Sequence, residues 1–253
     1  MNGEKAHLVF TDPPYMVNYH SPGGLDYNSK KFDGTGGAIF SDDLNEEDAK
    51  EFFRKVLENL YAVSTDDACI YWWFANRNNH INRQAFIETK WKMSQIIIWI
   101  KNSMIFSHGQ DYHRQYEPVM FGWKEGKSHF RNKMYANFKD VINLDFTDYQ
   151  EMFDVWYERR DVTSNYIHPT QKPVRLAERA LKKHSEFGDI VVDLFSGSAS
   201  TLMGCQGGGR RCYTSDLDPK YVHAGIKRFM RFYPDIPVKC LTRDVDMSLI
   251  KGV

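Results

Sequence analysis

Short apolar runs alternate with amphipathic stretches along this chain, which predicts parallel strands joined by helices that cover both faces of a sheet. Strands are expected at residues 7–10, 69–74, 94–100, 118–123, 190–194, 212–215 and 238–241. Helices are expected at residues 46–63, 78–89, 174–184, 200–206 and 219–232. The run at 190–194 has the apolar character of a strand buried on both faces. The pattern therefore indicates an α/β fold, and we expect one domain over residues 1–253.

Two segments lack such a pattern. Residues 16–44 are rich in Gly, Asn, Ser and Asp, and we expect them to form a long mobile loop. Residues 124–167 are polar and poorly periodic, so no helix or strand is predicted there.

Charge and cysteine usage narrow the class of protein. The chain has 33 Lys and Arg against 33 Asp and Glu, which argues against a broad basic surface for nucleic acid. No apolar stretch approaches the roughly 20 residues that span a bilayer. The four cysteines form no CxxC pair, so neither a zinc site nor a disulfide scaffold is indicated. We expect a cytoplasmic protein with no metal and no membrane association.

A turn of small residues, Ser196-Gly197-Ser198-Ala199, follows the strand expected at 190–194 and leads into a helix. Such a turn lets backbone N–H groups and a helix N-terminus approach a ligand closely, as in nucleotide-binding folds. Asp216 comes after the next strand, where folds of this kind hold a ribose diol. The alternative is a turn whose small residues and acidic cap serve the fold alone.

The tetrapeptide Asp12-Pro13-Pro14-Tyr15 follows the first expected strand, at the edge where open α/β sheets build their sites. The exocyclic amine of a nucleobase is a poor nucleophile because its lone pair is delocalised into the ring. Accepting both N–H bonds, with the Asp12 carboxylate and the Pro13 carbonyl, would make that lone pair available. Tyr15 offers a flat face on which a base can stack. The alternative is a rigid Pro-Pro turn in which Asp12 caps the following loop.

These elements together resemble the amino-group DNA methyltransferases of the β class. The tetrapeptide at 12–15 resembles their motif IV, and residues 193–201 resemble their S-adenosylmethionine motif. Residues 168–173 look like the HPT.KP element of these enzymes, and residues 116–122 look like their YEP strand. The resemblance implies a Rossmann-like methyltransferase fold with a mostly parallel seven-stranded sheet and a circularly permuted motif order. It is strongest to phage-type adenine-N6 enzymes, often fused to a ParB-like nuclease domain.

The resemblance also implies a role for each matching residue. Asp12, Pro13, Pro14 and Tyr15 would hold the flipped base. Residues that would wrap the methionine part of S-adenosylmethionine are Asp193, Phe195, Gly197 and Ser198. Asp216 would bind the ribose, Thr170 and Lys172 would reach the cofactor carboxylate, and His168 would shape that loop unless it is only a structural histidine.

Three departures from the family pattern stand out. The family usually has Gly where this chain has Ala199, and Glu where it has Asp216. Relatives also carry a strand before the catalytic motif, whereas only 11 residues precede Asp12 here. We expect the strand at 238–241 to fill that position, which would make the fold complete but fully permuted.

The sequence thus predicts an S-adenosylmethionine-dependent enzyme, bacterial or phage-encoded, that methylates the N6 amine of adenine in DNA. Alternatives are an N4-cytosine DNA methyltransferase, a methyltransferase of RNA or of a protein amide, and a nucleic-acid-binding module with a relict cofactor site. Residues 124–167 would be a small target-recognition insertion, too short to read more than a short or relaxed site. Its candidate phosphate contacts are Lys124, Lys127, Arg131, Lys133, Arg159 and Arg160. A homodimer would be in keeping with the β class.

Overall fold

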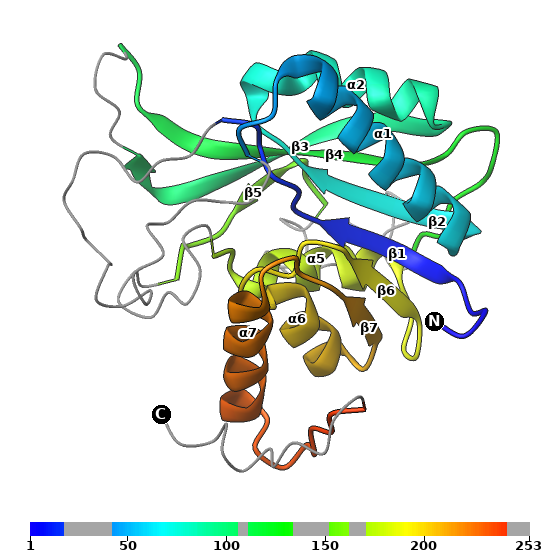
Figure 1. The fold of residues 1–253 in the computed structure, drawn as a ribbon, viewed down its shortest axis with the longest axis vertical. Coiled ribbons are helices and arrows are strands. Elements are labelled where there is room, and N and C mark those ends of the chain that lie inside the picture. Colours follow the sequence, from blue (N-terminus) through cyan, green and yellow to red (C-terminus); the bar gives the residue numbers. More distant parts are fainter. Residues whose placement is uncertain (18–41, 106–110, 134–151, 162–170, 242–253) are drawn as a thin grey trace.

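A computed structural model describes residues 1–17, 42–105, 111–133, 152–161 and 171–241 (Figure 1). Most of the loop expected at 16–44 lies outside these residues. In the described part of the chain, no helix is long and apolar enough to cross a membrane.

Seven strands form one sheet in the order β5-β3-β4-β2-β1-β6-β7. β4 is antiparallel to its neighbours β2 and β3, and every other pair of adjacent strands is parallel. The expected α/β fold with a mostly parallel seven-stranded sheet is therefore confirmed. The strand bounds are β1 Ala6–Thr11, β2 Ser64–Trp73, β3 Trp91–Ile105, β4 Arg114–Lys124, β5 Val155–Tyr157, β6 Ile190–Asp193 and β7 Arg211–Thr214.

The helices agree closely with those expected from the sequence. α1 begins after Asn45, whose side chain accepts a hydrogen bond from the Asp48 backbone N–H at 3.0 Å, and its first turn carries three acidic residues. A short 3₁₀ helix, η1, precedes α2. The bounds are α1 Glu46–Val63, η1 Asn76–Asn78, α2 Asn79–Glu88, α5 Val174–His184, α6 Ser200–Gly208 and α7 Pro219–Phe232.

Helices cover both faces of the sheet because side chains alternate along its central strands. On β1, Val9 packs against α1 and α2, in a core that includes Phe53 and Phe86. Leu8, one residue earlier, packs on the opposite face against α5, in a core that includes Leu176. Both cores are fully buried, so β1 is held at the centre of the molecule.

The strand expected at 238–241 is absent, which corrects the prediction of a complete but permuted sheet. The described residues 233–241 that follow α7 contain only turns and irregular chain, and β7 is left as the edge strand. The seventh strand is instead β5 at the other edge, where residues 155–157 pair in parallel with β3. Part of the segment at 124–167 is therefore built into the sheet.

The connections on the two sides of β1 run in opposite directions. From β1 the chain passes through α1 to β2, its neighbour on one side, whereas β6 on the other side leads through α6 to β7. Where connections diverge in this way, the carboxyl ends of adjacent parallel strands leave a crevice between them. The crevice here lies after Thr11 and Asp193, which end β1 and β6.

Candidate active site

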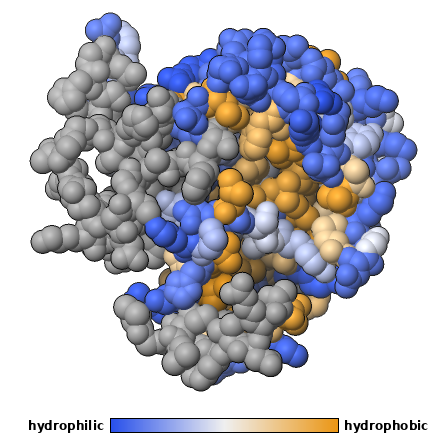
Figure 2. Space-filling model, viewed as in Figure 1, coloured by the Kyte–Doolittle hydropathy of each residue, from blue (hydrophilic) through white to orange (hydrophobic). Residues whose placement is uncertain are grey.

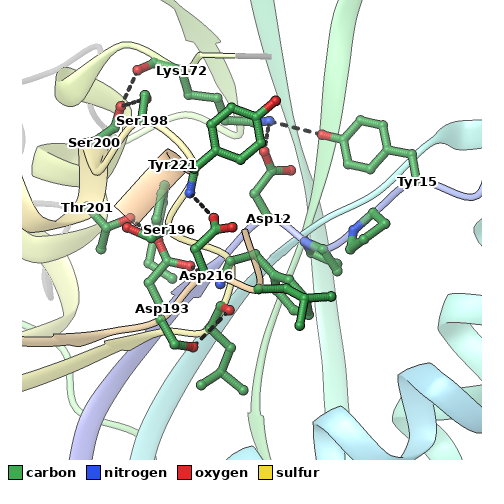
Figure 3. Close-up of a pocket in the computed structure, with 18 of the residues that line it drawn as sticks. Asp12, Tyr15, Lys172, Asp193, Ser196, Ser198, Ser200, Thr201, Asp216 and Tyr221 are labelled. Atoms are coloured by element: carbon green, nitrogen blue, oxygen red, sulfur yellow. Dashed lines mark hydrogen bonds and ion pairs between the residues drawn. The ribbon is translucent and has the colours of Figure 1, made fainter. Parts of the chain in front are cut away.

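A pocket of about 400 Å³ occupies this crevice. Residues 12–15 after β1, 193–198 after β6 and 215–218 after β7 all line it, so one cavity joins the two predicted motifs. In Figure 3 the side chains of Asp12, Lys172 and Tyr15 converge at one end, and Asp193 and Asp216 lie at the other. Figure 2 shows hydrophobic residues forming a band across this face, between hydrophilic surfaces.

Asp216 holds the turn between β6 and α6. One of its carboxylate oxygens accepts the Gly197 N–H at 2.8 Å, and the other accepts the Asp218 N–H at 3.0 Å. Each carboxylate oxygen has a second lone pair, so Asp216 keeps acceptor capacity for the hydroxyls of a ligand. It lines the pocket, as the ribose role requires.

An apolar wall faces this carboxylate. The ring of Phe195 packs against that of Phe52 from α1, with centroids 6.0 Å apart, and Val56 and Leu194 line the pocket beside them. Leu217 is 73% exposed at the same cavity. Exposed apolar side chains beside a polar anchor are the usual make-up of a site for a flat ring.

Asp193 has a supporting role in the turn. Its carboxylate accepts hydrogen bonds from the Thr11 hydroxyl at 2.9 Å, the Thr201 hydroxyl at 2.6 Å and the Phe195 N–H at 3.1 Å. Burial raises the pKa of Asp193 to about 6, although these hydrogen bonds oppose the shift. The residue lines the pocket, but its oxygens bind the protein's own donors.

Arg228 of α7 holds Ser198 in the turn and Ser200 at the start of α6. Its guanidinium donates to the Ser198 carbonyl at 2.8 Å and to the hydroxyls of Ser198 and Ser200 at 3.2 Å each. Ser200 in turn donates to the backbone carbonyl of Lys172 at 2.5 Å. The turn at 196–199, which we predict to bind the cofactor and call the cofactor turn, is thereby tied to the segment that carries Lys172.

Asp12 presents one paired and one unpaired oxygen. Its Oδ2 binds the Lys172 ammonium, whereas its buried Oδ1 accepts no hydrogen bond from any described residue. A buried acceptor without a donor is unfavourable, and it marks a place where a ligand N–H would bind. Tyr15, which follows two prolines, also lines the pocket.

Lys172 therefore contacts residues of the predicted catalytic tetrapeptide, and its contact with a cofactor carboxylate stays a prediction. Its ammonium contacts Asp12, donates to the Tyr15 hydroxyl at 3.2 Å and lies 3.3 Å from Glu117. The predicted partners Thr170 and His168 lie outside the described residues.

Two further residues of the site carry no role in the sequence prediction. Glu117 accepts a hydrogen bond from the Tyr15 hydroxyl at 3.1 Å and is paired with Lys101 of β3. Glu117 belongs to the YEP element, which could have drawn attention to it. Lys101 follows an apolar strand and has no sequence signal, yet its side chain is only 2% exposed.

These charges perturb one another. Burial raises the pKa of Asp12; the Lys172 ammonium opposes that shift, whereas the Glu117 carboxylate adds to it. Burial alone would also raise the pKa of Glu117, but Lys172 and Lys101 outweigh it and lower that pKa to about 2. Lysine side chains thus favour the ionised form of both carboxylates.

The prediction that Lys124 contacts phosphate is wrong. Lys124 is 3% exposed, donates to the Ser64 carbonyl at 2.8 Å and lies over the Tyr61 ring. Ser64 begins β2, so Lys124 is at the end of the sheet opposite the pocket. Burial of the stem and a backbone acceptor explain why this lysine belongs to the core.

The other basic candidates divide between the two ends of the sheet. Lys127 is paired with Asp66 near the start of β2. The backbone on either side of Arg131 donates hydrogen bonds to the carbonyl of Asp67 and to the last turn of α5, close to Lys133. These three basic residues are therefore away from the pocket. Arg159 and Arg160 lie at the pocket end. The Arg160 N–H donates to Asn102 at the carboxyl end of β3, close to Lys101.

The comparisons with known proteins agree with this geometry. Residues 6–227 match the family described as DNA methylase. The chain is 24% identical over 245 residues to the DNA adenine methyltransferase YhdJ of Escherichia coli strain K12, which covers 89% of this chain and 76% of the relative. The expected likeness to phage-type enzymes fused to a ParB-like nuclease stays a prediction.

Two solved structures share the fold. The complex of M1.HpyAVI with S-adenosylmethionine has a TM-score of 0.64 at 17% identity and covers 90% of each chain. The cytosine-N4-specific PvuII DNA methyltransferase has a TM-score of 0.67 at 14% identity, over 98% of this chain and 85% of the other. With the family match over most of its length, the chain belongs to the S-adenosylmethionine-dependent DNA methylases.

Proposed function

We propose that this protein transfers a methyl group to the N6 amine of an adenine that is flipped out of DNA into the pocket. The observation that carries the proposal is the unpaired Asp12 Oδ1, a buried acceptor in the cavity that also holds the cofactor turn. An amine N–H is the donor that such an oxygen lacks. The adenine enzyme YhdJ, similar over 89% of this chain, supports adenine as the target.

The residues of the pocket fit S-adenosylmethionine. Asp216 would accept the ribose hydroxyls, the wall formed by Phe52 and Phe195 would pack against the adenine ring, and the turn at 196–198 would bind the methionine part. The cofactor supplies an electrophilic methyl group bound to a sulfonium. The aromatic face of Phe195 suits a nearby cation.

The base would be held by the residues after β1. Asp12 Oδ1 accepts one amine N–H, the Pro13 carbonyl accepts the other, and Tyr15 stacks on the ring, with Pro14 stiffening the turn. As the new N–C bond forms and the bond between sulfur and the methyl group breaks, which leaves S-adenosylhomocysteine, the nitrogen would gain positive charge that these two acceptors stabilise. The nitrogen then loses a proton, and Asp12, whose pKa is raised by burial, is a base suited to receive it.

DNA would be positioned mainly by its phosphates. Arg159 and Arg160, at the pocket end of the sheet, are the contacts from the original set that we retain. The segment at 124–167 is short for a separate recognition domain, and residues 155–157 within it form β5, which supports a short or relaxed target site.

The alternative of N4-cytosine methylation has its own support. The PvuII enzyme, which shares the fold, is cytosine-N4-specific, and both targets are exocyclic amines with the same hydrogen-bonding needs. The chemistry of Asp12 does not separate them, so the distinction rests on the measured product. An RNA or protein-amide substrate and a relict binding module are tested in the same experiment.

The experiment compares methyl transfer from radiolabelled S-adenosylmethionine to duplex DNA, RNA and a protein mixture, followed by mass spectrometry of the digested nucleosides. We expect N6-methyladenine from DNA, and none with Asp12→Ala. N4-methylcytosine would overturn the base assignment, and label only in RNA or protein would overturn the substrate. Absence of turnover on every substrate would favour the relict module. Sequencing of methylated DNA tests the relaxed site, which a long, strictly required sequence would contradict.

A further inference from the structure

Two buried lysines and two partly buried carboxylates meet at the end of the pocket that is lined by residues 12–15. Asp12 and Glu117 carry two negative charges, and Lys101 and Lys172 carry two positive ones, so the group is neutral as a whole. The chain is Asp12–Lys172–Glu117–Lys101, and it runs from the end of β1 across β4 to β3. We call these four residues the charge chain.

Aromatic rings lie beside both ammonium groups. The Lys172 nitrogen lies 4.7 Å from the centroid of Trp73 and 5.3 Å from that of Tyr15. The Lys101 nitrogen lies 5.1 Å from the centroid of Trp99. Cation–π contacts of this kind favour the charged lysine and exclude water from the pairs.

Each member of the charge chain constrains the next. Glu117 has one oxygen on Lys101 and the other near Lys172 and the Tyr15 hydroxyl, so it cannot turn away from the site without losing Lys101. Lys172, shared between two carboxylates, binds only one oxygen of Asp12. The Asp12 Oδ1 is therefore kept for a ligand.

We propose that Glu117 and Lys101 are positioning residues for methyl transfer, which hold Lys172 on Asp12 Oδ2 so that Oδ1 stays free for the target amine. The inference rests on the proposed function. It assigns a task to Lys101, which is not among the residues that line the pocket, and to Glu117, which lines it beside Asp12. Lys101 anchors Glu117, and Glu117 limits how far Lys172 neutralises Asp12.

The other groups around Asp12 come from three elements. Asp193, at the end of β6, adds a negative charge near Asp12, and the Tyr15 hydroxyl lies close to Asp12 while it donates to Glu117. Arg160, after β5, adds positive charge near Lys101. All of these stay in place in the variants below, so differences between variants report on the charge chain.

The test compares Glu117→Gln, Lys101→Met and the double variant with the wild type. The readouts are the ¹³C titration of Asp12, assigned with Asp12→Asn, and the pH profile of kcat/KM on DNA. Removing the Glu117 charge should lower the pKa of Asp12 by roughly one unit and move the acidic limb to lower pH. Removing Lys101 should raise the pKa of Asp12 and move the acidic limb to higher pH, because Glu117 then draws Lys172 away from Asp12.

The double variant exchanges an ion pair for neutral side chains of similar size, which proteins often tolerate. It should titrate between the two single variants, with kcat below that of the wild type and unchanged affinity for S-adenosylhomocysteine. Glu125→Gln, an exposed substitution at the far end of β4, is the matched control and should leave both readouts unmoved.

Shifts in the same direction for both single variants, or no shift in either, would overturn the proposal. The NMR titration needs no turnover, so it remains decisive if the product is N4-methylcytosine and the adenine assignment fails. Conversely, the wild type could form N6-methyladenine while Asp12 titrates in the variants as it does in the wild type. That outcome would leave the proposed function standing and refute only the positioning roles of Glu117 and Lys101.

Discussion

The hydroxyl of Thr11, which ends β1, donates a 2.9 Å hydrogen bond to the carboxylate of Asp193, which ends β6. The same hydroxyl accepts the Leu194 N–H at 3.2 Å. Thr11 immediately precedes Asp12, and Asp193 opens the cofactor turn. This hydrogen bond thus fixes the end of β1, which leads into the proposed base site, to the end of β6, which leads into the cofactor turn. It lies one residue before Asp12.

Asp193 should make stability depend on pH. Because its pKa is raised to about 6, the folded protein binds a proton there more readily than the unfolded chain does, and this contribution to stability is lost as pH rises from about 4 to 6. In Asp193→Asn, one oxygen still accepts from Thr11 and Phe195, and the amide can donate to Thr201. As the pH rises from 4 to 7, the free energy of unfolding of the variant should increase by roughly 3 kcal/mol relative to that of the wild type.

Urea unfolding at several pH values measures this difference. Asp43→Asn, at an exposed position, is the control and should follow the wild type. Parallel curves for Asp193→Asn and the wild type would show that Asp193 ionises as it does in the unfolded chain.

Asp12→Ala should separate binding from chemistry. The variant keeps the cofactor turn intact, so its affinity for S-adenosylhomocysteine should match the wild type in calorimetry. Loss of the acceptor for the reacting amine should reduce kcat by at least about 100-fold. Full activity on DNA would refute the role of Asp12.

Asp216→Ala should show the reverse pattern. Removing a charged acceptor of the ribose hydroxyls, which also holds the Gly197 N–H, should weaken S-adenosylhomocysteine binding by roughly 10- to 100-fold. Asp235→Ala, an exposed change of the same type after α7, should bind normally. Unchanged affinity in Asp216→Ala would remove this residue from the cofactor site.

Ala199 and Gly225 face each other closely enough that the alanine and the glycine could be swapped between the two positions. Ala199 has φ of +60°, a conformation that favours glycine, and a Cβ added to Gly225 would lie 3.0 Å from the Cβ of Ala199. Gly225→Ala alone should therefore lower the free energy of unfolding of the protein by about 1–2 kcal/mol. The double variant with Ala199→Gly should instead have a free energy of unfolding about 1 kcal/mol higher than the wild type. Glycine at position 199 removes the strain of an alanine with positive φ, and alanine is a better helix former than glycine inside α7.

Urea unfolding of both single variants and the double variant gives the coupling free energy. Additive effects would show that the two positions do not meet. The same comparison tests whether alanine, where the family has glycine, weakens the cofactor turn through its backbone conformation.

Local signals account for the parts of the fold that the sequence predicted well. α1 follows from Asn45, its acidic first turn and one apolar face, and α7 from the Asp218 cap with Pro219 in the first turn. β5 has no such signal, because residues 155–157 are a strand only through their pairing with β3. Residues 238–241 have strand composition but no paired neighbour in the structure, which shows that β-propensity alone does not decide.

The site divides in the same way. The turns at 12–15 and 196–198 were identified because their conformations are encoded in adjacent residues. Lys101 and Glu117 meet only because β3 and β4 pair in one register, and a single buried lysine has no pattern of its own. The error at Lys124 has the same origin, since burial of its side chain is decided by distant residues.

The sheet is divided at the boundary between β1 and β6. Residues before 162 build the five strands from β5 to β1, and residues after 170 build β6 and β7, so no strand of one part lies within the other. A gene that encoded these two parts in the opposite order would be expected to produce the same pocket. Evolution is therefore free to rearrange the order of the two motifs while keeping the reaction.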